Sequence, residues 1–109
     1  RRKKQRVTEY DTAAFDAAME KNATLVVDFF ADWCGPCRML APVMETLSEE
    51  FGDKARFVKI NVDDNPELAR RFSIMSIPCV MVFKNGALAG KNAGFIPKAA
   101  MQEFIENNL

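Results

Sequence analysis

The feature that most constrains the fold is a strand pattern that continues into a helix pattern through a turn with two cysteines. Residues 24–30 (TLVVDFF) are mostly β-branched or aromatic, as in a strand buried on both faces. The turn at residues 33–37 is WCGPC, and from Met39 to Phe51 apolar residues recur every three or four positions, as on one face of a helix. Such a strand–helix unit is typical of α/β proteins, in which helical crossovers join parallel strands.

The remaining patterns extend this unit into a mixed sheet. Asn85-Gly86 is a strong hairpin signal, so the strand after it should run antiparallel to the strand before it. We therefore expect a central mixed sheet with helices on both faces. The other expected elements are strands at residues 56–62, 79–83 and 87–93, and helices that start at Asp11 or Thr12, at Pro66 and at Pro97.

Composition sets the class of protein and excludes several functions. The chain has 109 residues, 49% of them apolar, which suits one globular domain with its own core. It contains no histidine, so Ser-His-Asp and Cys-His nucleophiles and His-containing zinc sites are excluded. No apolar run approaches the roughly 18 residues of a membrane-spanning helix, and no signal-peptide pattern is present.

Charge is balanced overall but uneven along the chain. The net charge of zero gives no general electrostatic case for binding nucleic acid. Five of the 15 positive charges lie in residues 1–6, which predicts a basic, solvated N-terminal tail at 1–6 and one domain at 7–109. A juxtamembrane remnant, a targeting signal and an engineered addition are the alternatives for this tail. The start at Arg1 leaves the compartment open, with the cytoplasm as the expected one.

The spacing of Cys34 and Cys37 predicts redox chemistry. Cys34 falls at a helix start, where free N–H groups stabilise a thiolate, so we expect it to be acidic and exposed. Cys37, on the same side but one turn deeper, would resolve the disulfide that Cys34 forms. Gly35 allows close approach of a partner, and Pro36 suits the first helical turn. Half of a zinc site and two inert thiols are the alternatives for the pair.

Five ordered blocks of sequence identify the chain as similar to the thioredoxin family. The first is Val27-Asp28-Phe29 leading to WCGPC, and the resemblance covers roughly residues 7–109. It implies a thioredoxin fold, with a five-stranded mixed sheet and about four helices, and a protein-disulfide reductase. The later blocks are Lys59 to Asp63 (KINVD), Ser76-Ile77-Pro78, Phe83 to Gly86 (FKNG) and Gly94.

The resemblance also implies roles for individual residues. Cys34 would be the nucleophile and Cys37 the resolving thiol. Asp28 would be a buried acid near Cys37, with Lys59 as its charge partner, and Pro78 a cis-proline beside the disulfide. The resemblance further implies recharging by a flavin-dependent thioredoxin reductase with electrons from NADPH, and no cofactor or metal bound to this chain.

Three positions depart from the usual pattern of the family. Phe30 stands where Trp is usual, which changes packing and fluorescence more than chemistry. Ser76 stands where glycine or another small residue is common. Cys79 follows Pro78 where Thr is usual, close to the expected site. Because no helix start would supply donors to Cys79, we expect an unreactive, buried thiol rather than a regulatory or cluster-ligating one.

A shallow apolar rim around the cysteines is the expected binding surface for clients. Its apolar members could instead be ordinary core. The functional alternatives are a non-catalytic binding or regulatory subunit, and a disulfide oxidase or isomerase, against which the Gly-Pro between the cysteines argues. We expect a monomer whose partners are the reductase and disulfide-containing proteins. The residues expected at the binding surface are Trp33, Gly35, Pro36, Met75, Ile77, Pro78 and Gly94, with Phe95 beside them.

Overall fold

The computed structural model describes residues 6–109 and confirms the α/β class. The sheet has the strand order β1-β3-β2-β4-β5. The parallel pairs are β1 with β3 and β2 with β3, whereas β4 runs antiparallel to β2 and to β5. In chain order the elements are β1 (Thr8–Glu9), α1 (Thr12–Glu20), β2 (Leu25–Phe30), α2 (Gly35–Phe51), a 3-10 turn (Gly52–Lys54), β3 (Arg56–Asn61), α3 (Pro66–Arg71), β4 (Cys79–Lys84), β5 (Ala87–Ala93) and α4 (Lys98–Asn107).

Local sequence signals explain where these elements begin and end. The Asp11 side chain accepts a hydrogen bond from the Ala14 N–H at 2.9 Å and so caps α1. Gly52 ends α2 with φ at +59°, a left-handed conformation that costs glycine little. Asn85 and Gly86 both have positive φ in the β4–β5 turn, as the hairpin signal predicts. Pro97 lies at the N-cap of α4, one residue before the helix begins.

One strand of the five has no signal in the sequence. This strand is β1, which has two residues and pairs with β3 through Thr8 opposite Val58. Two residues are too few to show the alternation that marks a strand, so its place depends on pairing with a distant segment.

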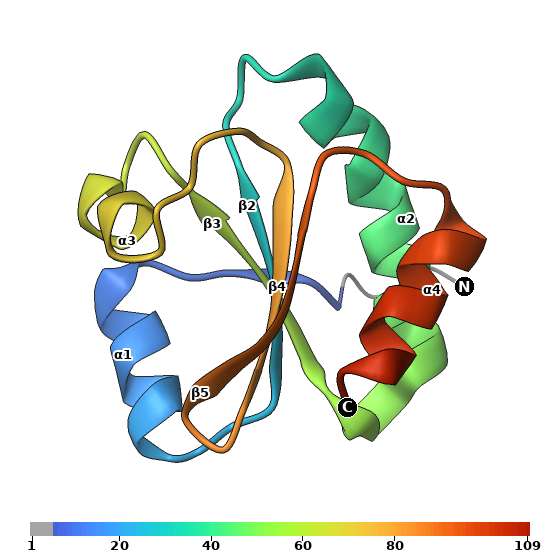
Figure 1. Ribbon diagram of the computed structural model, residues 1–109, viewed down its shortest axis with the longest axis horizontal. Coiled ribbons are helices and arrows are strands. Elements are labelled where there is room, and N and C mark those ends of the chain that lie inside the picture. Colours follow the sequence, from blue (N-terminus) through green and yellow to red (C-terminus); the bar gives the residue numbers. More distant parts are fainter. Residues whose placement is uncertain (1–5) are drawn as a thin grey trace.

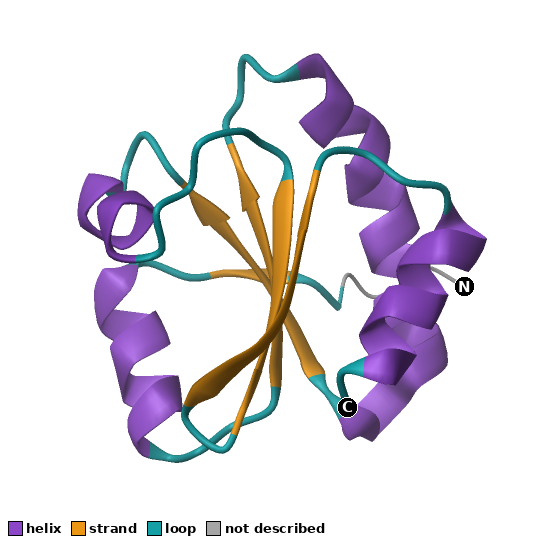
Figure 2. Cartoon of the chain, in the orientation of Figure 1, coloured by secondary structure: helices purple, strands orange, loops and turns teal. Residues whose placement is uncertain are grey.

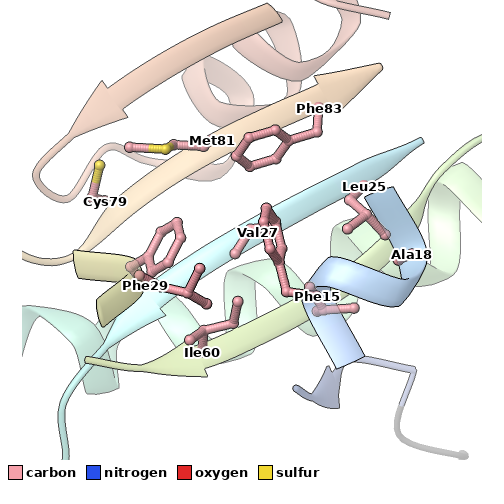
Figure 3. Close-up of a cluster of buried hydrophobic side chains, with 11 residues drawn as sticks. Phe15, Ala18, Leu25, Val27, Phe29, Ile60, Cys79, Met81 and Phe83 are labelled. Carbon is pink, nitrogen blue, oxygen red and sulfur yellow. The ribbon is translucent and has the colours of Figure 1, made fainter. Parts of the chain in front are cut away.

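Helices cover both faces of the sheet, with α1 and α3 on one face and α2 and α4 on the other (Figure 1; Figure 2). The α1/α3 face holds a cluster of aromatic side chains, among them Phe15 and Phe83 in edge-to-face contact at 5.1 Å between ring centroids (Figure 3). Successive residues of β2 alternate between the faces: Leu25, Val27 and Phe29 point to the α1/α3 face and Val26 to the other. Asp28 therefore lies on the face that α2 covers.

Candidate active site

The two cysteines of the WCGPC turn form a disulfide at the start of α2. Cys34 is the N-cap of the helix, and its Sγ accepts a hydrogen bond from the Cys37 N–H at 3.2 Å. Pro36 occupies the first turn, where a missing N–H costs nothing, and the space where Gly35 would carry a Cβ is open. The backbone thus aims a donor at the first sulfur and leaves its surroundings open for a partner.

The expectation that Cys34 is exposed is wrong for this disulfide form. Cys34 is 4% exposed and Cys37 is 3% exposed, so the two residues do not differ in depth. Cys34 Sγ lies 3.8 Å from the Ile77 carbonyl oxygen, and both cysteines pack with Ala31. The sequence could not predict this cover because the segment with Ile77 lies 43 residues away along the chain.

Asp28 and Lys59 meet behind the disulfide. They lie directly opposite each other in the register of β2 and β3. Together with Cys37 they line a pocket of about 190 Å³. A larger hollow, of about 440 Å³, lies at the opposite end of β2 and β3 and has no cysteine in its lining.

Burial raises the pKa of Asp28 from 3.8 to about 7, and the charge of Lys59 acts in the opposite direction. The side chain is 4% exposed, and its Oδ1 has no hydrogen-bond partner among residues 6–109. A carboxyl group with this pKa exchanges protons near neutral pH, which is what a general acid or base beside a thiol requires.

Two other loops complete the site at the same end of the sheet as the disulfide (Figure 1). The Ile77–Pro78 peptide bond is cis, as the resemblance implies. The Gly94 N–H donates a hydrogen bond to the Pro78 carbonyl oxygen at 2.7 Å, which joins the loop before β4 to the loop after β5. Gly94 has φ at +99°, a conformation that glycine adopts readily.

The apolar residues expected at a binding rim are on the surface. Trp33 is 69% exposed, Met75 92% and Phe95 37%, while Ile77 is half-buried. Pro36 is exposed and Pro78 is buried. The alternative that Trp33, Met75 and Phe95 belong to the core is therefore wrong.

Comparison with known proteins agrees with this geometry. The family model described as "Thioredoxin" matches residues 6–107. The chain is 45% identical over 93 residues to the thioredoxin of Bacillus subtilis (strain 168), covering 85% of this chain and 89% of that protein. It is 43% identical over 103 residues to the thioredoxin of Staphylococcus aureus (strain Mu50 / ATCC 700699), covering 94% and 98%.

The chain belongs to the thioredoxin family. It has the thioredoxin fold, a five-stranded mixed sheet with four helices, and it is a dithiol–disulfide oxidoreductase whose redox pair is Cys34–Cys37. The alternatives of a non-catalytic module and of a zinc site at this pair are set aside by that result.

One contact in this thioredoxin site is not predicted by any pattern in the sequence. Trp33 Nε1 donates a hydrogen bond to Asp63 Oδ2 at 2.9 Å. The side chain of Asn61 accepts from the Asp63 N–H at 2.8 Å and from the Asp64 N–H at 3.3 Å, and so shapes the loop that carries Asp63. Trp33 and Asp63 are 30 residues apart, and no local pattern links them.

Cys79 is buried, as expected, but on the other face of the sheet. Its side chain belongs to the cluster beneath α1 and α3, on the same face of β4 as Met81 (Figure 3). Burial raises its pKa above the usual range, the charge of Lys91 acts in the opposite direction, and the charge of Asp28 raises the pKa further. The short chain distance from Cys79 to Pro78 therefore does not bring its sulfur to the face of the thioredoxin disulfide.

The described part of the chain contains neither a group of side chains suited to bind a metal ion nor a helix able to span a membrane. Within residues 6–109, no three Cys, Asp or Glu side chains are grouped to hold a metal ion. Over the same residues, every helix is too short or too polar to cross a bilayer. The predicted basic tail falls mainly on residues 1–5, which lie outside the described residues. The backbone N–H of Arg6 donates a hydrogen bond to Glu45 of α2 at 3.0 Å.

Proposed function

We propose that this thioredoxin-family chain is a protein-disulfide reductase in which Cys34 attacks and Cys37 resolves. The observation that carries the proposal is the placement of Cys34 Sγ at the N-cap of α2, where the Cys37 N–H donates to it. Donors at a helix start favour the thiolate, which is the attacking species in disulfide exchange. Among residues 6–109, no backbone N–H donates a hydrogen bond to Cys37 Sγ, and Cys37 lines the pocket with Asp28.

The reaction begins from the reduced pair. The Cys34 thiolate attacks one sulfur of a client disulfide, which forms a mixed disulfide and releases the other client sulfur as a thiolate. The exposed indole of Trp33, with Met75 and Phe95, provides the apolar surface on which the client segment rests. The rest of the surface around the sulfurs comes from two turns and a loop, with the residues Gly35, Pro36, Ile77, Pro78 and Gly94.

The second step releases the client. Asp28, as a carboxylate, takes the proton of the Cys37 thiol, and the Cys37 thiolate then attacks Cys34 Sγ. The Cys34–Cys37 disulfide forms as the bond between Cys34 and the client sulfur breaks, and the second client sulfur leaves as a thiolate. Water or the protonated Asp28 returns protons to the two client sulfurs, and two electrons have passed to the client. Lys59 lies opposite Asp28 and keeps its pKa from rising further.

The cycle is closed by a second partner. We infer that a flavin-dependent thioredoxin reductase returns two electrons from NADPH to the Cys34–Cys37 disulfide, and that this chain itself binds no cofactor. Similarity to bacterial thioredoxins supports this partner and a cytoplasmic location. We also propose that residues 7–109 form one thioredoxin domain, that residues 1–6 are a basic tail, and that the protein works as a monomer.

Insulin reduction tests the proposal. With NADPH and a bacterial thioredoxin reductase, the protein should reduce insulin disulfides at a rate that increases with its concentration. Cys34→Ser should abolish turnover without forming a mixed disulfide, whereas Cys37→Ser should accumulate one through Cys34, visible by mass spectrometry. A mixed disulfide trapped through Cys37 instead would contradict the assignment of roles.

A further inference from the structure

Lys59 and Asp28 are neighbours that do not form an ion pair. Among residues 6–109, no salt bridge joins them, and Asp28 Oδ1 accepts no hydrogen bond. Lys59 Nζ instead lies 5.5 Å from the centroid of the Phe30 ring. This is within the roughly 6 Å over which an aromatic face attracts a cation. The ring and the carboxylate therefore compete for one ammonium group.

The backbone places these three side chains on one face of the sheet. Asp28 and Phe30 are two residues apart on β2, so their side chains point the same way. Lys59 stands opposite Asp28 on β3. All three line the pocket of about 190 Å³ that also reaches Cys37. Lys59 therefore shares one pocket with the carboxyl group whose Oδ1 accepts no hydrogen bond.

Charged and titratable groups near Asp28 come from each of the elements that pack against it. Arg38 is not free to replace Lys59, because its Nη1 donates to the Asp32 carbonyl oxygen at 2.7 Å. Lys59 is the cation whose charge acts on Asp28. The groups that line the pocket with Asp28 are Lys59 from β3, Cys37 and Arg38 from α2, and Asp32 from the loop after β2. Cys79 of β4 lies on the opposite face of the sheet, where the charge of Asp28 still acts on it.

We propose that Phe30 is a positioning residue for the redox reaction: its ring holds the Lys59 ammonium near Asp28 but out of contact with it. This rests on the proposed function of Asp28 as the proton acceptor for Cys37. A contact ion pair would stabilise the carboxylate and weaken it as a base. Held at the ring, the ammonium lowers the pKa of Asp28 only partly, which agrees with its value of about 7. An aromatic ring at position 30 thus has a chemical role.

The test is the titration of the Asp28 carboxyl group, followed by carbon-13 NMR of the disulfide form, in which the Lys59–Phe30 contact is seen. Phe30→Leu removes the ring and keeps an apolar side chain, so Lys59 can reach Asp28 Oδ1. We expect the midpoint to fall by about 0.5 pH unit or more. Phe30→Trp keeps an aromatic face and should hold the midpoint at or above the native value. A fall in Phe30→Trp, or an unchanged or raised midpoint in Phe30→Leu, would overturn the proposal.

A double substitution separates positioning from packing. In a Lys59→Met background there is no ammonium to position, so adding Phe30→Leu should leave the Asp28 midpoint unchanged. The same downward shift in that background would show that Phe30 acts only through packing, and the proposal would be wrong. Val62→Ala is the packing control, since Val62 and Phe30 both pack against Ala31 and the two cysteines. It should not move the midpoint.

This readout is independent of turnover. The carboxyl titration reports on the Phe30–Lys59 contact even if the native protein fails to reduce insulin, which would count against the proposed function alone. If both hold, Lys59→Met should shift the pH–rate profile to higher pH, because it removes the cation that lowers the pKa of Asp28. An Asp28 midpoint insensitive to Phe30 in a fully active protein would refute only the positioning role.

Discussion

The three cysteines of this thioredoxin-family chain lie in two contrasting regions, on opposite faces of the sheet. Cys34 and Cys37 begin α2 and form the redox disulfide, whereas Cys79 begins β4 and packs beneath α1 and α3. All three are buried, with exposures of 4%, 3% and 1%. Burial alone therefore does not separate the reactive sulfurs from the inert one.

What separates the two regions is the set of groups around each sulfur. Cys34 Sγ has a backbone donor, a partner sulfur three residues away and exposed apolar neighbours. Cys79 has aromatic and aliphatic neighbours, and the charge of Asp28 raises its pKa further. Asp28 stands between the regions, since β2 pairs with β4. As a base, the Asp28 carboxylate accepts a proton from Cys37. As a negative charge, it raises the pKa of the Cys79 thiol.

The largest difference between the two regions is expected when a cysteine in each is replaced by serine. Cys34→Ser should reduce insulin-reducing activity by about 1,000-fold or more, because a serine hydroxyl is not a nucleophile for disulfides. Cys79→Ser should retain most of the activity. Steady-state rates with NADPH and thioredoxin reductase provide the measurement. Comparable losses in the two variants would place Cys79 in the reaction.

Alkylation of the reduced, folded protein sharpens the same contrast. We expect iodoacetamide to modify Cys34 roughly 100-fold faster than Cys79 at neutral pH, because exposure of the Cys79 thiol requires opening of the core. Peptide mass spectrometry over time gives the rate at each site. Denaturant should equalise the rates, which serves as the control. Equal labelling in the native state, or a Cys37–Cys79 disulfide, would contradict the expectation.

Asp28→Asn tests the group that lies between the regions. The folded-state pKa of about 7 exceeds the ordinary 3.8, so ionising the buried acid lowers the free energy of unfolding as pH rises between those values. The amide cannot ionise, and the variant should be more stable than the native protein by about 2–4 kcal/mol above pH 7. The difference should shrink toward pH 4. Reductase turnover should slow severalfold, since the base is lost.

Urea unfolding at several pH values measures this difference in stability. Asp32→Asn is the matched control, because Asp32 is exposed in the loop after β2 and should show no such dependence on pH. If Asp28→Asn left the stability at pH 8 unchanged or lower, the carboxyl group would not be a buried acid.

The smallest expected effect is that of Cys79→Thr, which installs the residue usual in the family. Activity should stay within about twofold of the native value, since the side chain lies on the face away from the disulfide. Stability should fall by about 1 kcal/mol, because the hydroxyl enters an apolar cluster. Insulin reduction and thermal unfolding provide the measurements. A large change in activity with unchanged stability would show that Cys79 takes part in function.

Much of the fold could be predicted because its signals are local. The Asp11 cap, the Asn85-Gly86 turn and the helix face from Met39 to Phe51 each depend on residues a few positions apart. The exception is β1, which is too short to carry a period of its own. Prediction of the redox pair depended equally on local spacing, since Cys34 and Cys37 are three residues apart at the start of α2.

Local signals in the sequence were enough to place two thiols at a helix start, an acid within a buried strand, and four of the five strands with the helices between them. Tertiary structure alone decided which groups act on each other. The register of β2 and β3 places Lys59 opposite Asp28, and the packing of Ile77 covers Cys34. The alternation of β4 sends Cys79 to the opposite face. The contacts of Lys59 with the site and of Ile77 with Cys34 join segments 30 or more residues apart, so they depend on how the buried faces fit together rather than on any local periodicity.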